Sequence, residues 1–387
     1  MLARQLPTHR RISSIGPVLA AATALVLLVG GCATERPQFT ELLWPPPPLT
    51  SRIKFVGILQ SQDDLGRSSG ELFVEALVGG KRAPESLQMP MAVAPSRDGK
   101  RLYVSDFAKG VVFVFDFEAR RLGFLGGPTL GFKRPFGVAV DEADNVYAVD
   151  SELKLIRVFD PKGKFLREIT HKSLERPTGI AIDPRRRRIY VADSSSRTSE
   201  NHVIHVFDMD GAHLKAFGGR GREEGKFYFP TYLAVDKSGN IYVADTLNAR
   251  VQVFDPEGRY VKAFGQRGDS IGMFDKPKGV ALDSFGNLYV VDSSWSNVQI
   301  FNQRKQILLY FAGWGRIPGL LFNPTGIAID KENRIYVVDC FNARVAIYQL
   351  INTKGEDSFL SPPLRADRGG DPEKEKAKKG RLEAHKQ

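Results

Sequence analysis

The stretch Pro230–Gly265 reads PTYLAVDKSGNIYVADTLNARVQVFDPEGRYVKAFG and contains four short apolar runs separated by turn residues. The runs are Tyr232–Val235, Ile241–Ala244, Arg250–Phe254 and Tyr260–Phe264. Apolar residues that alternate over a few positions, bounded by Gly, Asn and Pro, are typical of β-strands and not of helices. The stretch therefore predicts a meander of four antiparallel strands.

The same unit recurs along the chain. Each copy opens on a proline and an apolar run and continues to a Tyr and an Asp, and successive copies lie 42 to 53 residues apart. The copies begin at Pro90, Pro135, Pro177, Pro230, Pro277 and Pro324. Repetition at this period, with four strands per copy, indicates a β-propeller. A lone meander cannot bury both of its faces, so we expect six blades packed side by side around an axis.

The two ends of the repeat region complement each other. Arg52–Leu59 (RIKFVGIL) reads as a strand without a blade, and the sixth copy ends at Val345–Leu350 without a fourth strand. We expect the N-terminal strand to complete the last blade, which closes the ring and removes its open edges. The fold class predicted is therefore an all-β, six-bladed propeller over residues 51–351.

The consensus of the copies resembles a known repeat. The consensus is similar to the NHL repeat. It begins with proline and x-Gly-[Ile/Val/Leu]-Ala-[Ile/Val/Leu]-Asp and continues to Tyr-Val-x-Asp and Asn-x-Arg. The glycine-rich connectors, such as Gly218–Pro230, are similar to that repeat as well. The resemblance spans the whole repeat region and implies a six-bladed propeller. Members of this family differ widely in function, so the resemblance does not transfer an activity.

Residues 1–31 read as an export signal, with a basic start followed by the small and apolar run Ile15–Val29. This run is too short for a stable membrane span. It ends in LVGGC, which resembles a bacterial lipobox and implies lipidation of Cys32. Because Ala33 is not an inner-membrane retention Asp, the resemblance favours a lipid anchor in the outer membrane. A plain secretory signal followed by a chance cysteine is the alternative.

The segments that flank the propeller have their own composition. Residues 32–50 contain the run Pro45–Pro48 and predict an extended polyproline spacer. Residues 352–387 are charged and poor in apolar residues, which predicts a disordered tail. The net charge of +11 favours anionic lipid, lipopolysaccharide or acidic partners, and nucleic acid is not expected for an exported protein. Lipidation would consume one of the two cysteines, so no structural disulfide is expected.

The repeat separates structural residues from candidate site residues. A residue present in every blade is expected to serve the blade, and a unique site must come from departures. The repeated Asp after the second strand is expected to cap the turn and to pair with Arg250 and Arg344 in two blades. This Asp occurs as Asp106, Asp150, Asp193, Asp245, Asp292 and Asp339.

Two departures predict a binding face. The loop after Asp193 is longer than its equivalents and offers Arg197, Glu200 and Asn201 as contacts. Large aromatic side chains occur in related loops of the same face and predict an aromatic patch for a protein partner, with scattered surface aromatics as the alternative. They are Phe107, Trp295 and Phe341.

A third candidate is the mouth of the central channel, where the residue after each repeat proline is expected to lie. This ring is apolar on one side and carries hydroxyls and an amine on the other, which suits a small anion or a peptide end. It consists of Met91, Phe136, Thr178, Thr231, Lys278 and Thr325.

Enzymatic alternatives lack the residues they need at that mouth. A Ca²⁺-dependent hydrolase needs six to eight oxygen ligands, and the predicted ring has no carboxylate. His202 and His205 lie an odd number of residues apart, so on a strand they face opposite sides and do not form a zinc pair. Cys340 has no histidine nearby in the sequence and reads as a small structural residue. No metal or cofactor is expected, although Ca²⁺ or Zn²⁺ stays open.

The sequence therefore predicts a cell-envelope lipoprotein whose propeller acts as a non-catalytic scaffold. Its expected partners are the membrane, through Cys32, and an envelope protein or ligand. The alternative is an exported hydrolase or lyase that acts in the central channel. Binding of an envelope glycan or lipopolysaccharide is a third possibility.

Overall fold

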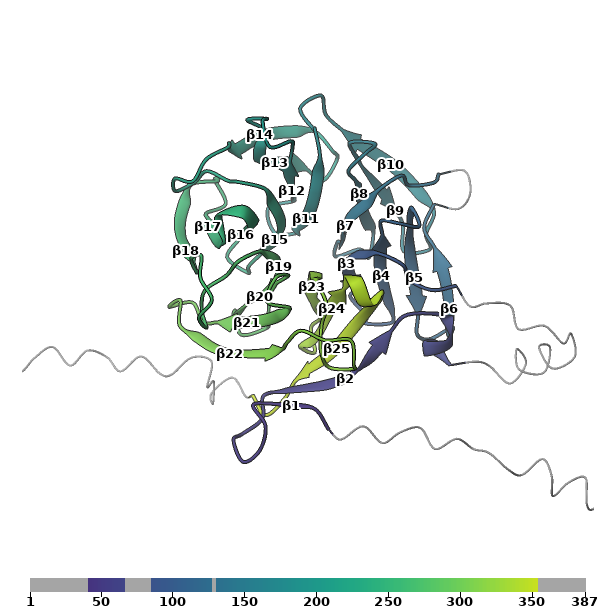
Figure 1. Cartoon of the computed structure of the whole chain (residues 1–387). Helices are drawn as coiled ribbons and strands as arrows, with labels where there is room; N and C mark the ends of the chain where they lie inside the picture. Colours follow the sequence, from purple (N-terminus) through teal and green to yellow (C-terminus); the bar gives the residue numbers. More distant parts are fainter. Residues whose placement is uncertain (1–40, 67–84, 127–129, 354–387) are drawn as a thin grey trace, which may run out of the picture. The chain divides into compact units, whose positions relative to one another are not determined.

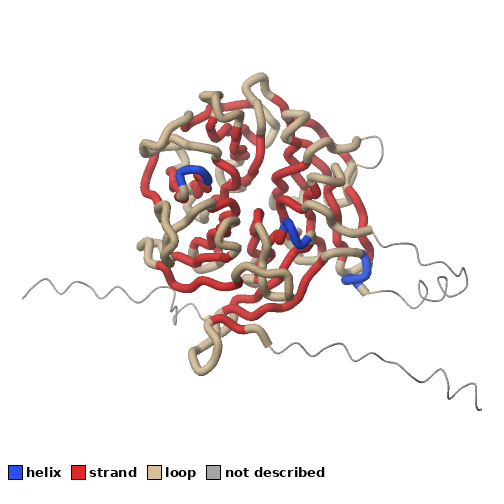
Figure 2. The backbone as a smooth tube through the Cα atoms, viewed as in Figure 1, coloured by secondary structure: helices blue, strands red, loops and turns tan. Residues whose placement is uncertain are grey.

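The structure is a computed structural model that describes residues 41–66, 85–126 and 130–353. The predicted export signal, Cys32 and nearly all of the predicted C-terminal tail lie outside these residues. In the described part, strands dominate and the helices are three short 3-10 turns: η1 (Gln62–Leu65), η2 (Thr246–Asn248) and η3 (Cys340–Asn342) (Figure 2). No helix in those ranges is long and apolar enough to cross a membrane.

Six antiparallel sheets form a ring of six blades, numbered here in sequence order (Figure 1). The first strand of each blade lies nearest the ring axis and contacts the first strands of both neighbouring blades. These inner strands are β3 (Pro90–Pro95), β7 (Pro135–Val140), β11 (Pro177–Asp183), β15 (Pro230–Val235), β19 (Pro277–Leu282) and β23 (Pro324–Ile329). The predicted six-bladed fold is confirmed.

The remaining strands follow outward in each blade. The second strands are β4 (Arg101–Asp106), β8 (Val146–Asp150), β12 (Arg188–Ser194), β16 (Ile241–Asp245), β20 (Leu288–Asp292) and β24 (Arg334–Asp339). The third are β5 (Val111–Asp116), β9 (Leu155–Phe159), β13 (His202–Asp208), β17 (Arg250–Phe254), β21 (Asn297–Phe301) and β25 (Arg344–Leu350). The outermost are β6 (Arg121–Phe124), β10 (Phe165–Thr170), β14 (His213–Gly218), β18 (Tyr260–Phe264), β22 (Ile307–Ala312) and β2 (Ile53–Leu59).

The N-terminal strand closes the ring, as predicted. β2 pairs with β25 from Ile53 opposite Leu350 to Leu59 opposite Val345, and so completes blade 6. A further short strand, β1 (Leu43–Trp44), pairs with β2 and gives this blade a fifth strand. The Trp44 ring lies 5.8 Å from the Tyr348 ring.

The proline run differs from the extended spacer that the sequence predicts. Pro45–Pro48 lie in the turn that joins β1 to β2. The physical reason is that Trp44 packs against the core of blade 6, which ties the start of the run to the propeller.

Glycines in the inner strands lie where neighbouring blades approach each other closely near the axis. Four inner strands carry Gly two residues after the repeat proline, at Gly137, Gly179, Gly279 and Gly326. A Cβ on Gly179 would lie 2.4 Å from the carbonyl oxygen of Thr231 in the next blade. Only glycine allows the backbones of adjacent blades to come this close.

The repeated tyrosines form the core between blades. They are fully buried, together with Tyr348 and several Phe residues. In several blades the phenol also reaches an Asp in the first hairpin turn, as between Tyr336 and Asp330 (3.1 Å) and between Tyr147 and Asp141 (3.2 Å). Burial of the ring and the hydrogen bond together fix the first turn on the blade.

The repeated Asp residues hold the segments that link consecutive blades. Each buried carboxylate accepts the backbone N–H of the residue two positions before its own repeat proline, at 2.6–2.7 Å. The predicted pairs with Arg250 (2.8 Å) and Arg344 (2.7 Å) are present. These contacts all lie at the end of the ring where the inner strands begin, which we call the connector face. The opposite end of the ring carries the turns between the first and second strands and between the third and fourth strands of each blade, and we call it the turn face.

Candidate functional site

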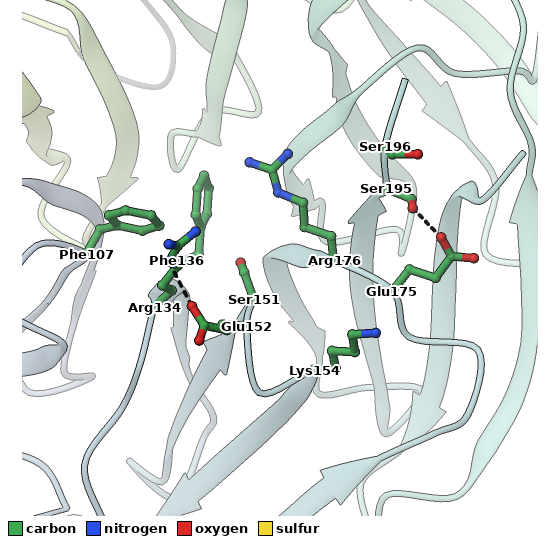
Figure 3. Close-up of a pocket in the computed structure, with 10 residues that line it drawn as sticks. All are labelled: Phe107, Arg134, Phe136, Ser151, Glu152, Lys154, Glu175, Arg176, Ser195 and Ser196. Atoms are coloured by element: carbon green, nitrogen blue, oxygen red, sulfur yellow. Dashed lines mark hydrogen bonds and ion pairs between the residues drawn. The ribbon is translucent and has the colours of Figure 1, made fainter. Parts of the chain in front are cut away.

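A pocket of about 620 Å³ opens on the connector face between blades 1, 2 and 3 (Figure 3). Its volume is in the range of sites that hold a small organic ligand. The lining residues come from loops and connectors of these three blades. They are Phe107, Arg134, Phe136, Ser151, Glu152, Lys154, Glu175, Arg176, Ser195 and Ser196.

One wall of the pocket is aromatic. Phe107 directly follows Asp106, at a position where the other blades have Ser, Thr or Cys. Phe136 is the second residue of inner strand β7, at a position where three other blades have Thr. The Arg134 guanidinium lies over the Phe107 ring at 5.3 Å from its centre and pairs with Glu152 at 2.9 Å. Both rings are therefore departures from the repeat, and Phe136 also packs against the core cluster that contains Tyr232.

The opposite wall is the long loop after Asp193, together with the connector into blade 3. The Glu175 carboxylate accepts the hydroxyls of Ser195 and Ser199 (2.9 Å for Ser199), and the Ser195 hydrogen bond is the main cause of the lowered pKa of Glu175. Asn201 donates to the carbonyl of Ser173 at 3.0 Å. These bonds fix the loop on the connector, so the wall is a built surface.

Two cations in the pocket have no ion pair. Arg176 and Lys154 are exposed, and in the described part of the chain neither side chain makes a hydrogen bond or salt bridge. The backbone of Arg176 is held by Asp193, whose carboxylate accepts its N–H at 2.9 Å. In Figure 3 the Arg176 guanidinium extends toward the aromatic wall. Lys154 is close enough to help lower the pKa of Glu175, after the Ser195 hydrogen bond, but forms no ion pair with it. The pocket therefore combines fixed walls with a net positive charge.

The predicted ring at the channel mouth is assembled, but its hydroxyls are already used. The Thr178 hydroxyl donates to the Thr231 carbonyl of the next blade at 3.0 Å, and Thr325 donates to the Met91 carbonyl at 2.8 Å. Thr231 and Thr246 share a hydrogen bond of 2.7 Å. The Thr178 and Thr325 hydroxyls therefore bond between blades, and ligand binding by this ring stays a prediction.

Lys278 is the remaining polar member of that ring. It is partly buried, and burial lowers its pKa. Cys340 is near enough to act on it electrostatically, but burial raises the pKa of that thiol to about 11, so the thiol stays neutral at pH 7. Cys340 occupies the position of Ser151, Ser194 and Thr246, which agrees with its interpretation as a small structural residue.

Tyr232 closes the centre of the ring and was missed by the sequence analysis. It replaces the glycine found at this position in four other blades. Its hydroxyl donates to the Met91 carbonyl of blade 1, across the ring, at 2.6 Å, and its ring lies 5.6 Å from Phe136. A cavity of about 570 Å³, lined by all six inner strands, opens at the turn face. The signal was available, because a bulky residue at a glycine position is visible in the aligned copies.

Comparison with known proteins supports the repeat and the fold. A family model described as NHL repeat matches residues 227–254 and 323–348, which include the first three strands of blade 4 and, in blade 6, the first two strands and most of the third. The chain is an NHL-repeat propeller. A search of curated proteins found no match.

Solved structures with a similar fold have diverse functions. A Bacteroides thetaiotaomicron protein of unknown function is 15% identical, covers 70% of this chain and 71% of its own, and has a TM-score of 0.54. The hydrazine synthase of Kuenenia stuttgartiensis is 16% identical, with 69% and 97% coverage and a TM-score of 0.50. Virginiamycin B lyase from Staphylococcus aureus is 13% identical, with 71% and 86% coverage and a TM-score of 0.50. At such identities the likeness concerns the fold alone.

The aromatic residues predicted to form one patch on this NHL propeller have different neighbours. Phe107 lines the pocket, and Trp295 lines a small hollow beside Ile271 and Tyr310. Phe341 packs edge-on against Phe322 (5.3 Å). Each of the three side chains starts at a different position in its loop, and the common aromatic patch stays a prediction.

The three loop residues also differ in role. Glu200 pairs with Arg220 at 3.5 Å, and Asn201 anchors the loop as described above. Arg197 is exposed and has no side-chain partner in the described ranges. Of the three, Arg197 is the one whose charge stays available at the rim.

A histidine cluster lies behind the loop wall. The His171 and His213 rings stack at 4.1 Å, and His213 Nε2 is 3.1 Å from His205 Nδ1. His205 Nε2 is buried and lies 3.7 Å from the Asp193 carboxylate, which holds the pocket connector. His202 bonds elsewhere, through the N–H of Phe229, so the expected separation of His202 from His205 is confirmed. Among the described residues, no group of three or more His, Cys, Asp or Glu side chains is arranged to hold a metal ion.

This cluster predicts sensitivity to acid. Burial, followed by the nearby His171 and His205, lowers the pKa of His213 below the value of a free histidine. The unfolded chain then takes up this proton at a higher pH than the folded chain. Stability is complete above a pH of about 6.5 and falls as the pH drops through the folded pKa. A His213→Phe variant, which keeps the stacking, should lose less thermal stability than the wild type between pH values of about 7.5 and 5. Equal losses would contradict this role.

Proposed function

We propose that this NHL propeller is a binding protein that holds a ligand in the connector-face pocket without transforming it. The observation that carries the proposal is that the pocket is built from departures from the repeat: Phe107, Phe136 and the long loop after Asp193. Departures from the repeat that gather around one cavity support a binding role for that cavity. The lyase alternative rests on fold likeness alone, and the described residues that line the pocket include no histidine.

The proposal is tested by filling the pocket. Ser196 is exposed on the pocket rim, so a Ser196→Trp variant should occupy the cavity without disturbing the core. Ser238→Trp, at an exposed position on the turn face, is the matched control. Native mass spectrometry of the full chain, purified in detergent from bacterial envelopes, should show a co-purified ligand. Its mass should be the same with the wild type and with the control. At least about 90% of the ligand should be lost with Ser196→Trp, a tenfold change in occupancy.

Equal retention by both variants would refute the pocket as the site. Recovery of the ligand in a chemically altered form would refute binding without turnover and favour the channel enzyme. Both outcomes come from the same spectra.

A second candidate function is supported by an exposed apolar cluster on blade 6 and the connector before it. Trp314 is 68% exposed, Ile317 66% and Phe341 54%, and the Trp314 and Phe341 rings both contact Phe322. Large apolar side chains at this exposure are typical of protein-docking surfaces. This supports a scaffold role for an envelope partner alongside the ligand pocket.

We further propose that the propeller is anchored by lipid on Cys32 in the outer membrane. The lipobox resemblance supports the lipidation, and Ala33 in place of a retention Asp supports the outer membrane. Labelled palmitate should be incorporated into the wild-type chain and not into a Cys32→Ser variant, because two or three acyl chains on that residue would supply the anchor. Equal labelling, or none in either chain, would remove the anchor from the account.

A further inference from the structure

The charges around the connector-face pocket do not cancel. Three cations line it, Arg134, Lys154 and Arg176, against two carboxylates, Glu152 and Glu175. Arg134 is paired with Glu152 at 2.9 Å. Glu175 accepts two serine hydroxyls of the long loop on one oxygen, Oε2, which ties that oxygen to the wall. The net charge of the lining is one positive charge, carried by side chains without an ion pair.

The free cations suit a planar anionic group. Arg176 offers a rigid fork of N–H donors that matches a carboxylate with two parallel hydrogen bonds. Lys154 adds a mobile point charge. Both side chains are exposed, so an incoming anion displaces little bound structure. A single residual charge favours a monoanion over a doubly charged phosphate.

The aromatic wall selects the rest of the ligand. One face of Phe107 is covered by Arg134, and Phe136 packs on Tyr232 behind it. The two rings are therefore held in place by their neighbours and present fixed apolar surface to the cavity. Flat apolar groups pack on such rings in offset or edge-to-face geometry. Arg176 and the aromatic wall line the same cavity, so one ligand can meet both.

We infer that the ligand of this pocket is an aromatic carboxylate, whose acid group meets Arg176 and Lys154 while its ring packs on Phe107 and Phe136. This inference rests on the proposed function and adds the chemical class of the ligand. It requires both the charge and the ring, and so it excludes simple anions and neutral aromatics as good ligands.

The test uses three fluorinated probes on the full chain in detergent, observed by ¹⁹F NMR. The probes are 4-fluorobenzoate, with charge and ring; 4-fluorobenzyl alcohol, with the ring alone; and difluoroacetate, with the charge alone. We expect 4-fluorobenzoate to bind saturably and at least about tenfold more tightly than either of the others, because removing the charge or the ring leaves one set of contacts unmade.

Variants identify the residues responsible. The double variant Arg176→Met and Lys154→Met should reduce the affinity for 4-fluorobenzoate about tenfold or more, to that of the alcohol. Arg304→Met with Lys305→Met is the matched control, since it removes one Arg and one Lys from an exposed turn on the other face. Phe136→Thr, the residue of three other blades, should weaken both aromatic probes and leave difluoroacetate unchanged.

The failure of this inference can be told apart from failure of the proposed function. Equal affinity for 4-fluorobenzoate and its alcohol, or an equal loss in both double variants, would overturn the ligand class. In that case, retention of the co-purified ligand by the wild type and its loss from Ser196→Trp would still support the pocket as the site. Loss of the Ser196→Trp effect would overturn the site itself.

Discussion

A chain that begins at residue 61 is expected to fail to fold cooperatively, whereas a chain that begins at residue 42 should fold. The difference is the closing strand β2, which buries Ile53 (0% exposed) and Leu59 (5% exposed) and covers Tyr348. Each such side chain contributes about 1.5–3 kcal/mol by burial, and each lost ladder hydrogen bond costs about 1 kcal/mol. The total of about 10 kcal/mol is comparable to the stability of a whole domain.

Circular dichroism during heating measures this effect. The longer chain should show one sharp transition, and the shorter chain should show none or one at a much lower temperature, because blade 6 is left with an open edge. If both chains melted in a transition at the same temperature, the ring would close without the N-terminal strand, and this prediction would be wrong.

Replacing a single inner-strand glycine is expected to have the second largest effect. A Cβ at Gly179 would lie 2.4 Å from the Thr231 carbonyl oxygen and 2.7 Å from the Tyr232 Cα, both backbone atoms of blade 4. The backbones of blades 3 and 4 must separate to accept it. Overpacking of this kind costs about 3 kcal/mol or more for Gly179→Ala.

Gly313→Ala is the matched control. A Cβ there meets nothing within 4 Å, and its backbone does not need the left-handed region. Its stability should change by no more than about 0.5 kcal/mol. Midpoints of urea unfolding compare the two variants with the wild type. Similar midpoints for both variants would mean that the inner glycines are not required by blade contact.

The fold was predictable because the strand and turn pattern of one blade occurs six times in the sequence. The turn residues, the inner proline and the buried tyrosine recur in phase, so each copy confirms the others. The closing strand followed from matching one orphan strand with one incomplete blade. The extended spacer failed as a prediction because a single residue, Trp44, finds a place in the core of blade 6, which no local composition reveals.

The site was only partly predictable. Phe107 and the loop after Asp193 were assigned to a binding face, whereas Phe136 was assigned to the channel mouth. Their convergence on one pocket depends on how blades 1, 2 and 3 are arranged around the ring. The same arrangement brings Arg134, Lys154 and Arg176 into the pocket from adjoining segments. The threonine hydroxyls show the converse limit, because their bonds to the neighbouring blade appear only in three dimensions.

Hydrogen–deuterium exchange of the full chain, with and without the ligand recovered from the envelope, tests the central claim most directly. The account predicts slower exchange in the connector at residues 171–176 and in the loop at residues 194–201, which carry one wall of the pocket. Exchange in the turn-face hairpins should not change. Protection confined to the segments around Trp314 and Phe341, or to the inner strands, would place the binding site elsewhere and contradict the account.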